Sequence, residues 1–467
     1  CASAFLRATP LRLENIPQQR YDVNIVLIAI DTLRADHLGC YGYARNTSPN
    51  IDAFARESVV FDRMIAPAIP THPSFATLMT GQYSVTHGVV AQGGHTILSR
   101  EAPWLPLSLQ RSGYLTCAVD NLADWLPGFR RGFEFYIDPS QRRTLGLSCD
   151  NREINRRAIP WLEHNCGEKF FLFIHYWDPH TPYLPPRAYR TLFYKGDPED
   201  PSVRAMDAME AHPLGAAWRE TWFNKLGKRI TDPAYIEALY DSEIRYCDEG
   251  VGQLLKAIDR LGLRDDTIVL LISDHGEMMY RHGIFFDHHG LYDGNLHVPL
   301  IMRHPDIAPR RVAHLTAHVD MAPTLLRAAG EEIPEGVEGR DLMPLARGDD
   351  AGPIRDFVIS QECTWQMKWS IRTPRHKFIL AREPDFYGTP PRELYDLEND
   401  PGEFRNLAAE EPEIAARLEA LLERWICDRL RRNGLGEDPL VRHGITLGKA
   451  WRDLKPPAGG ADRAETA

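Results

Sequence analysis

Four uninterrupted apolar runs constrain the fold of this chain more than any other feature of its sequence. They are Asn24 to Ile30, Leu115 to Val119, Phe170 to Tyr176 and Thr267 to Ile272. Runs without alternating polar residues are typical of strands that are buried on both faces. Amphipathic patterns lie between them, most clearly from Ile244 to Leu261, where apolar residues return every three or four positions. Buried strands that alternate with helices predict an α/β fold, with a parallel sheet wrapped by helices.

The pattern changes after about residue 345. Phe357 to Ser360, Trp369 to Arg372 and Phe378 to Leu380 read as short strands, and Glu413 to Arg432 as a long charged amphipathic helix. We therefore predict a smaller antiparallel α+β subdomain beside the large α/β domain. The predicted divisions are a leader over 1–20, the large domain over 21–345, the subdomain over 346–432 and a surface or mobile tail over 433–467.

Composition excludes several classes of protein. Apolar residues make up 43% of the chain and charged residues 25%, which is ordinary for a globular protein. The net charge of −11 argues against a nucleic-acid partner and against docking on anionic lipid. No stretch approaches the roughly 20 apolar residues that span a bilayer. The eight cysteines form no CxxC pair, so we expect reduced, partly buried thiols.

The chain begins at Cys1, so it is trimmed or processed. A lipid-anchored mature cysteine and an arbitrary chain boundary both explain this start, and no signal peptide is visible in the sequence. We expect a soluble protein, and leave its compartment, cytoplasmic or periplasmic, and its assembly into a homo-oligomer open.

Polar residues follow the apolar runs directly. Asp31 follows the first run, the segment from Trp177 to His180 follows the third, and Asp274 and His275 follow the fourth. Ligands of parallel α/β sheets bind beyond the carboxyl ends of the strands. Three separate strands are therefore expected to bring Asp or His to one edge of the sheet.

Two further motifs carry possible chemistry. In the segment from Pro70 to Ser74, Pro73 suits the first turn of a helix, so Thr71 is expected just before a helix N-terminus, where an anion is favoured. Taken alone, such a threonine is more often a cap. Four histidines also fall within sixteen residues: His282, His288, His289 and His297.

Together these residues suggest one metal site. Asp31, Asp274 and His275 would hold a divalent ion, with the Thr71 hydroxyl on the same ion. A metal ion lowers the pKa of a coordinated oxygen and so makes a hydroxyl a competent nucleophile. Mostly oxygen ligands with one imidazole favour Mn²⁺, Zn²⁺ or Fe over Ca²⁺, and Mg²⁺ is possible although it sheds water reluctantly.

From about Asn24 to Leu407 the chain resembles the sulfatase family of the alkaline phosphatase superfamily. The segments that carry the resemblance are Asp31 to Gly39, Ser48 to Asp52, Thr71 to Gly81, His175 to Tyr183, Asp274 to Glu277, Tyr292 to Pro299 and Glu393 to Leu407. The resemblance implies a large mixed sheet flanked by helices with a small antiparallel C-terminal subdomain. It also implies Asp31, Asp274 and His275 as metal ligands, Thr71 as nucleophile, and His180 as a contact of the ester or its leaving group.

The sequence also departs from the family pattern. Sulfatases have Cys or Ser at the nucleophile, which is oxidised to formylglycine, whereas Thr71 cannot be converted, and Phe75 stands where the motif has Arg. The lysines that clamp sulfate are absent, since no Lys precedes Lys169 or lies within 257–367. We expect His95 and His288 or His289 to take their place. Thr32 replaces a second acidic or amide residue, which argues against a four-carboxylate Ca²⁺ site.

These departures favour phosphorus over sulfur as the reacting centre. A formylglycine hydrate can expel sulfate through its second hydroxyl, but a threonine ester must be cleaved by attack at its central atom. We therefore predict a metal-dependent hydrolase of phosphodiesters or phosphonate monoesters that works through a covalent phosphothreonine on Thr71. His180, with His288 or His289, would bind the ester and protonate the leaving group, and Asp178 and His95 would bind substrate. A diester substrate is favoured over a monoester, because a site with one metal ion and few cationic side chains suits a substrate with a charge of −1.

Four alternatives remain open at this point. A second ion held by Asp178, His180 and His289 would favour monoesters. A sulfatase that acts without formylglycine is the main competing activity. Transfer to an alcohol acceptor instead of water is a third possibility, and a catalytically silent, metal-stabilised binding protein is the fourth.

Overall fold

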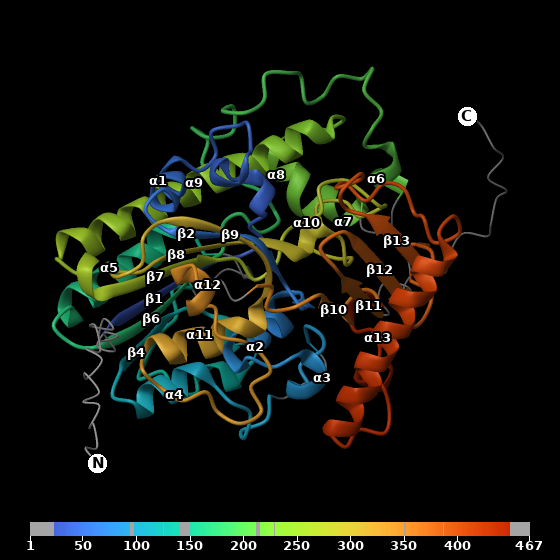
Figure 1. Cartoon of the computed structure of the whole chain (residues 1–467). Coiled ribbons are helices and arrows are strands. Elements are labelled where there is room, and N and C mark those ends of the chain that lie inside the picture. The colour runs from blue at the N-terminus through green and yellow to red at the C-terminus, as the bar shows by residue number, and fades with distance from the viewer. Residues whose placement is uncertain are drawn as a thin grey trace, which may run out of the picture.

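An eight-stranded mixed sheet forms the centre of the protein (Figure 1). The computed structural model describes residues 23–93, 98–124, 126–140, 149–211, 215–227, 229–349, 352–385 and 387–448. The strand order is β5-β4-β6-β1-β7-β8-β2-β9. The bounds are β5 Phe135–Ile137, β4 Leu115–Val119, β6 Phe170–Tyr176, β1 Asn24–Ile30, β7 Thr267–Ile272, β8 His297–Arg303, β2 Val59–Ile65 and β9 Arg310–Ala317. The four apolar runs are thus the strands β1, β4, β6 and β7, at the predicted residues.

Five neighbouring strands, from β5 to β7 in the strand order, run parallel, and the sheet becomes mixed only on the other side. β1 pairs in parallel with β6 and β7, and β4 pairs in parallel with β6 and β5. β8 is antiparallel to both β7 and β2. Every residue of β1, β6 and β7 is buried, which explains why these strands carry no alternating polar residues.

Helices cover both faces of the sheet (Figure 1). One face carries α1 (Pro49–Ala55), α5 (Asn151–Asn165) and the 28-residue α9 (Pro233–Arg260), and both shorter helices pack on α9. The other face carries α2 (Thr71–Thr80), α4 (Leu105–Arg111), α11 (Met321–Ala328) and α12 (Met343–Arg347). The helix predicted over residues 244–261 is the second half of α9.

A second sheet follows toward the C-terminus, in the order β13-β12-β11-β10-β3. Its strands are β13 Arg392–Asp396, β12 His376–Ala381, β11 Lys368–Arg372, β10 Val358–Glu362 and β3 Ala68–Ile69, and α13 (Pro412–Arg432) packs on β11 and β12. The pairs are antiparallel except β3, which runs parallel to β10. The predicted fold class is confirmed. The strand β3, which joins the two sheets, was not predicted, because a strand of two residues has no recognisable hydrophobic period.

Part of the predicted tail is ordered against this second sheet. Residues 439–443 form α14 (Pro439–His443), and Asp438 accepts a hydrogen bond from the indole nitrogen of Trp369 at 2.9 Å. The leader over 1–20 and the last part of the tail lie outside the described residues. The domain limits at 20, 345 and 432 stay predictions.

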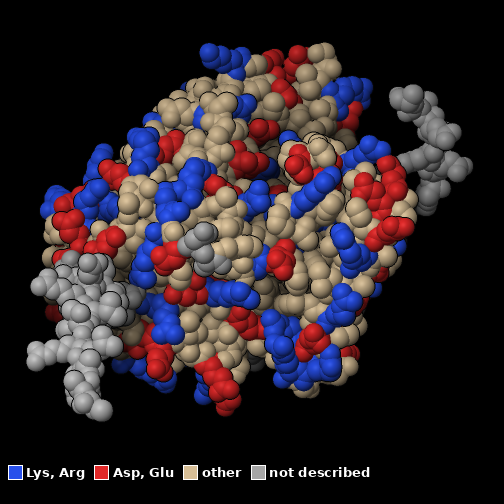
Figure 2. Space-filling model, viewed as in Figure 1, with Lys and Arg blue, Asp and Glu red and all other residues tan. Residues whose placement is uncertain are grey.

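The distribution of surface charge and the state of the cysteines agree with the expectations from composition. Lys and Arg side chains alternate with Asp and Glu over the face drawn in Figure 2. Within the described residues no helix has the length and apolar character needed to cross a bilayer. The cysteines there are free: Cys40, Cys117, Cys149, Cys166, Cys247, Cys363 and Cys427.

Candidate active site

Helix α2 begins at Thr71, at the junction between the two sheets. Thr71 follows β3 after the single residue Pro70 and is the first residue of the helix, one position further in than predicted. The hydroxyl of Ser74, in the first turn, donates to the backbone carbonyl of Asp274 at 2.6 Å. This bond ties the start of α2 to the loop after β7. As a result the Thr71 hydroxyl lies 3.2 Å from Nε2 of His275.

Asp31, Asp274 and His275 converge at the carboxyl ends of β1 and β7. One ligand atom of each lies within 4.8 Å of the others, and all three residues are completely buried. Oδ1 of Asp31 and Oδ2 of Asp274 have no hydrogen-bond partner among the described residues, and Oδ2 of Asp31 has only the ring of His175, 3.2 Å away. Buried carboxylates left unpaired are costly, so this donor set fits a divalent cation of the kind that oxygen and imidazole ligands select.

The orientation of His275 adds to this argument. Its Nδ1 lies 2.9 Å from the carbonyl oxygen of Gly276, which can only accept, so Nδ1 carries the proton in the neutral ring. The other nitrogen, Nε2, then turns a lone pair toward Oδ2 of Asp274, 3.2 Å away, and toward the Thr71 hydroxyl. Such an arrangement is favourable only with a positive charge among these groups, either a bound cation or a proton on the ring.

A second layer of charges surrounds Asp31. Nε2 of His175 lies 3.2 Å from Asp31, and Nδ1 of His175 lies 2.9 Å from the carboxylate of Asp120. Burial works against a charged ring, but these two carboxylates outweigh it and raise the pKa of His175 to about 10. Burial likewise favours neutral Asp31, but the charges of His180, His175 and His275 lower its pKa to about 2.

Sequence reasoning missed both His175 and Asp120. Asp120 follows the apolar strand β4 directly, so the rule that identified Asp31 and Asp274 would have found it. His175 lies inside β6, and its signal is a histidine in an otherwise apolar, fully buried strand.

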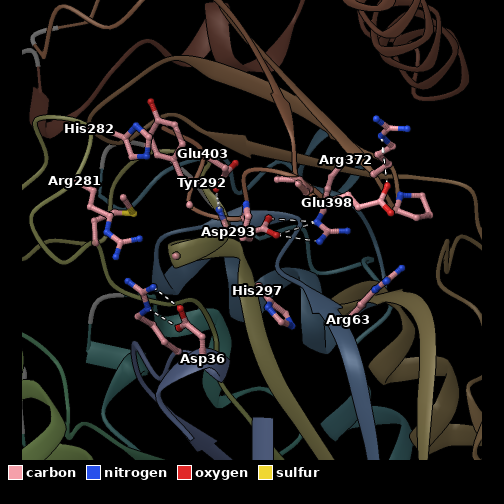
Figure 3. Close-up of a pocket in the computed structure, with 18 of the residues that line it drawn as sticks. Asp36, Arg63, Arg281, His282, Tyr292, Asp293, His297, Arg372, Glu398 and Glu403 are labelled. Atoms are coloured by element: carbon pink, nitrogen blue, oxygen red, sulfur yellow. Dashed lines mark hydrogen bonds and ion pairs between the residues drawn. The ribbon is translucent and has the colours of Figure 1, made fainter. Parts of the chain in front are cut away.

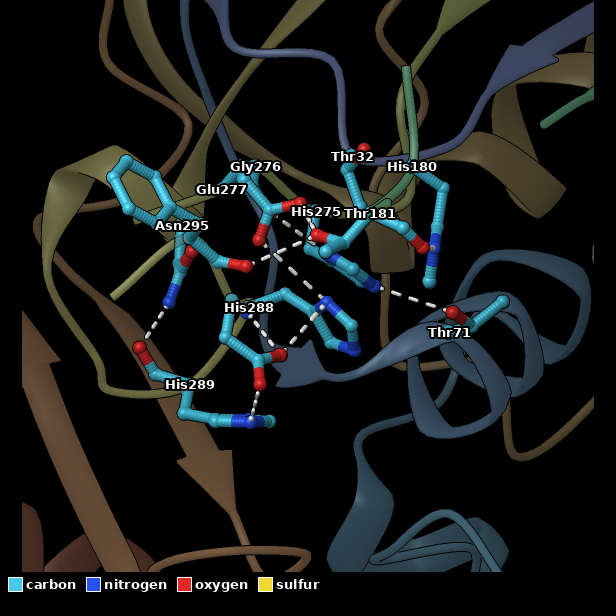
Figure 4. A network of polar contacts seen from close by, with 12 residues as sticks. Thr32, Thr71, His180, Thr181, His275, Gly276, Glu277, His288, His289 and Asn295 are labelled. Atoms are coloured by element: carbon cyan, nitrogen blue, oxygen red, sulfur yellow. Dashed lines mark hydrogen bonds and ion pairs between the residues drawn. The ribbon is translucent and has the colours of Figure 1, made fainter. Parts of the chain in front are cut away.

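The predicted histidines take different positions (Figure 4). The ring of His288 stacks on that of His275 with centroids 5.0 Å apart, and the ring of His180 lies 5.0 Å from His288. Nδ1 of His180 lies 2.6 Å from the carbonyl oxygen of Thr181, so the other ring nitrogen of His180, Nε2, is the one that can contact a substrate. His289 is turned away, with Nε2 2.9 Å from Asp287 and its ring beside Trp365.

Asp178, a predicted substrate contact, is not part of this cluster. The carboxylate of Asp178 accepts hydrogen bonds from the backbone and side-chain nitrogens of Asn151 at 3.2 and 3.1 Å, at the start of α5. Because Asp178 faces α5 and His289 faces Asp287, the predicted second-ion group of Asp178, His180 and His289 does not come together. His95 lies outside the described residues.

Phe75 occupies the position where the sulfatase motif has Arg. Its side chain is completely buried, with its ring edge-on to His175 at 4.9 Å and to Phe173 at 5.7 Å. The apolar ring of Phe75 therefore lies beside His175, at the position where the sulfatase motif has a cationic side chain.

His282 and His297 belong to a separate cavity of about 540 Å³ (Figure 3). Alternating cations and carboxylates line it, among them Asp36, Arg63, Arg281, Arg372, Asp293 and Glu403. Among the described residues, Thr71, Asp31, Asp274 and His275 are not part of its lining. Two of the four clustered histidines are thus separated from the candidate active site.

Known proteins match this chain over most of its length. The family model described as Sulfatase matches residues 23–331, and that described as N-sulphoglucosamine sulphohydrolase, C-terminal, matches residues 281–428. The chain is 25% identical over 438 residues to the choline-sulfatase of Rhizobium meliloti (strain 1021), covering 82% of each protein. It is also 25% identical over 510 residues to the multifunctional alkaline phosphatase superfamily protein PehA of Trinickia caryophylli, covering 87% of this chain and 95% of that protein.

The fold is shared with solved structures. The crystal structure of the phosphonate monoester hydrolase of Agrobacterium radiobacter matches with a TM-score of 0.69 and 24% identity, covering 88% of this chain and 96% of that chain.

Proposed function

This chain belongs to the sulfatase family, and from that premise we propose that it hydrolyses phosphodiesters or phosphonate monoesters through a covalent phosphothreonine on Thr71. Membership of the family makes it a hydrolase of the alkaline phosphatase superfamily. The proposal concerns the reacting centre, the nucleophile and the roles of individual residues.

One observation carries the proposal. The Thr71 hydroxyl, at the first residue of α2, lies 3.2 Å from Nε2 of His275, whose ligand atom lies within 4.8 Å of those of Asp31 and Asp274. A hydroxyl that only capped a helix would accept a bond from the backbone of its own first turn. Thr71 instead faces the group of buried ligands that the strands β1 and β7 bring together.

Asp31, Asp274 and His275 would hold a divalent ion, which supplies Lewis acidity and positive charge when bound. Oγ1 of Thr71, whose proton passes to solvent, then attacks phosphorus in line, and the bond from phosphorus to the alcohol oxygen breaks. The N-terminus of α2 stabilises charge on the non-bridging oxygens. His180, with His288, binds the ester and delivers a proton to the departing alcohol. Water finally cleaves the phosphothreonine and restores the hydroxyl.

Two features favour phosphorus. Threonine cannot become formylglycine, so its ester can be released only by attack at the central atom. Phe75 also leaves the site without the Arg of the sulfatase motif, which suits a substrate with a single negative charge. The similarity to a phosphonate monoester hydrolase and to a multifunctional superfamily member agrees with this choice.

The second candidate is a sulfatase that works without formylglycine. The similarity to a choline-sulfatase and the match of the C-terminal residues to a sulphohydrolase model favour it. On this alternative Thr71 would carry a sulfate ester.

A panel of four nitrophenyl esters tests the proposal: the sulfate, the phosphate monoester, a phosphodiester and a phosphonate monoester. Metal-free protein would be assayed with Mn²⁺, Zn²⁺, Fe²⁺, Mg²⁺ or Ca²⁺ added back. We expect the phosphodiester or phosphonate to be the best substrate by kcat/KM. A sulfate turned over far faster than either would select the alternative.

The variant Thr71→Ala is the control that separates an enzyme from a binding protein. We expect it to lose at least about three orders of magnitude in kcat/KM while it keeps its fold and its metal content. Thr71→Ser, which keeps a hydroxyl, should retain measurable turnover. Equal activity of wild type and Thr71→Ala would show that the nucleophile lies elsewhere.

A further inference from the structure

A second group of buried ligand atoms lies beside the first, on the loop that follows β7. Glu277, Asp287 and His288 each place one ligand atom within 4.8 Å of the other two. Nδ1 of His288 lies 3.3 Å from Oδ1 of Asp287 and 3.6 Å from Oε1 of Glu277 (Figure 4). Two carboxylates and one imidazole nitrogen thus face a common point.

Glu277 supplies the observation that points to a ligand. Its side chain is completely buried. One oxygen, Oε2, accepts a hydrogen bond from the hydroxyl of Thr181 at 2.9 Å. The other oxygen, Oε1, has no hydrogen-bond partner among the described residues and is directed at Nδ1 of His288, which also has none there. An unpaired, fully buried carboxylate oxygen is costly unless a proton or a cation completes it.

The surrounding backbone holds these ligands in place. Residues 278 and 287 pair as an antiparallel bridge, in which the backbone nitrogen of Met278 donates to the carbonyl of Asp287 at 2.8 Å. Glu277 and His288 flank this bridge on its two strands, so the pairing brings them opposite each other.

Side-chain contacts fix the ligand atoms further. Thr181 fixes the rotamer of Glu277 from the β6 side, and His289 engages the second oxygen of Asp287 at 2.9 Å. The three ligand atoms are therefore set by contacts that do not themselves require an ion.

We propose that Glu277, Asp287 and Nδ1 of His288 bind a second divalent transition-metal ion, separate from the one at Asp31, Asp274 and His275. This group differs from the second-ion group that the sequence predicted, because it contains neither Asp178 nor His180. The two carboxylates neutralise the charge of one divalent ion, and two oxygens with one nitrogen suit Mn²⁺ or Zn²⁺.

A consequence for His288 follows from this ligand set. Coordination through Nδ1 leaves the proton on Nε2, so the ring presents an N–H donor from its other edge. Because that ring stacks on His275, the donor lies next to the candidate active site. The second ion would thus fix the tautomer of His288 and add positive charge in a region that has no lysine between Lys256 and Lys368.

Metal stoichiometry tests the proposal without any need for turnover. The protein would be stripped of metal, saturated with Mn²⁺ or with Zn²⁺, desalted and analysed by elemental mass spectrometry. We expect two ions per chain in the wild type, and one in each of Glu277→Gln, Asp287→Asn and Asp274→Asn. Asp274→Asn is the matched control, since it removes a carboxylate from the first site and leaves the second intact.

Calorimetric titration of the same proteins should show that Glu277→Gln weakens only one class of site, by more than about 100-fold. A wild type that binds a single ion, lost in Asp274→Asn, would overturn the proposal. Two ions retained by both Glu277→Gln and Asp287→Asn would overturn it as well. If one of these two variants does not fold, judged by circular dichroism, the wild-type count and the other variant decide.

Discussion

At the scale of single residues, burial and nearby charge shift the pKa values of two carboxylates in opposite directions, although the two look alike in the sequence. Asp31 and Asp178 both follow central strands of the sheet. The imidazoles around Asp31 lower its pKa to about 2, although burial opposes this. Burial raises the pKa of Asp178 to about 7, although Asn151 donates hydrogen bonds to it. Asp31 is therefore ready to hold a cation, whereas Asp178 tends to keep its proton.

The raised pKa of Asp178 predicts a pH-dependent stability. Between its ordinary pKa of 3.8 and the folded value of about 7, the folded protein binds more protons than the unfolded chain, so stability falls as pH rises through this window. Asp178→Asn, which imitates the neutral acid, should remove this loss. We expect the variant to match the wild type at pH 4 and to exceed its unfolding free energy by about 4 kcal/mol at pH 8. Urea unfolding at both pH values measures the difference, and an equal difference at the two would contradict the assignment.

His175 is expected to act on the metal through Asp31. Its imidazolium lies 3.2 Å from Asp31 and is held by Asp120 at 2.9 Å. His175→Gln removes the charge that keeps Asp31 oriented, so we expect Mn²⁺ affinity to fall by about 10- to 100-fold. Calorimetric titration of the metal-free protein measures this. Unchanged affinity in a folded variant would mean that Asp31 is positioned by other contacts.

The candidate residues were only partly predictable from the sequence. The apolar strands identified Asp31, Asp274 and His275, because the residue after a buried strand lies at the binding edge whatever the details of packing. The direction in which Asp178 points depends on where α5 begins, and no local pattern records that contact. The separation of His282 and His297 from His288 likewise depends on how the loop after β7 folds back on itself.

At the scale of elements, the position of α2 relative to β7 decides whether Thr71 can react. The Ser74 hydroxyl joins the two by donating to the carbonyl of Asp274, and it also lies 3.1 Å from Nδ1 of His318. Both partners are fully buried, so no water can replace the hydroxyl without a rearrangement.

Ser74→Ala should therefore loosen the start of α2. We expect a loss of about 1–3 kcal/mol in unfolding free energy, from the unpaired carbonyl. We also expect a kcat at least about 10-fold lower, since a small shift of the nucleophile is costly. Thr80→Ala is the matched control, because the Thr80 hydroxyl bonds only within α2 and to the turn after it. A kcat equal in Ser74→Ala and Thr80→Ala would refute the role of Ser74.

At the scale of the whole molecule, the two sheets are joined by short elements and by buried ion pairs. β3 adds to the edge of β10 and ends two residues before Thr71, so the C-terminal sheet helps to place the nucleophile. Lys377, on β12, is completely buried and lies 2.5 Å from Asp293 and 2.8 Å from Glu403. Asp293 begins the short helix α10 (Asp293–Leu296) that precedes β8 of the large sheet.

Lys377→Met should consequently destabilise the whole protein. It leaves the buried carboxylate of Glu403 without its cation, while Asp293 keeps Arg372 at 3.0 Å, and we expect a loss of about 3–5 kcal/mol in unfolding free energy. Arg375→Met is the control. The Arg375 side chain pairs with Asp396 but is 55% exposed, so we expect its replacement to lower the unfolding free energy by less than about 1 kcal/mol. Chemical denaturation of both variants gives the comparison. A similar loss for the two would show that the buried cluster does not join the sheets.

The sequence predicted this organisation in outline, because long apolar strands and long amphipathic helices keep their periods in any context. It could not predict the crossing of chain segments between the two sheets. Ala68 and Ile69 form a strand only because β10 offers a free edge, and Lys377 is buried only because Asp293 and Glu403 meet it from distant parts of the chain.

The central claim is that an unmodified Thr71 carries the transferred group. Its most direct test is to quench the protein in acid during turnover of a nitrophenyl phosphodiester and to map the modified residue by mass spectrometry of its peptides. We predict a single phosphoryl group on Thr71, absent from Thr71→Ala, with a burst of nitrophenol equal to the amount of enzyme if breakdown of the intermediate is slow. Turnover that proceeds with Thr71 unmodified under every quench condition, or in full without its hydroxyl, would contradict the account.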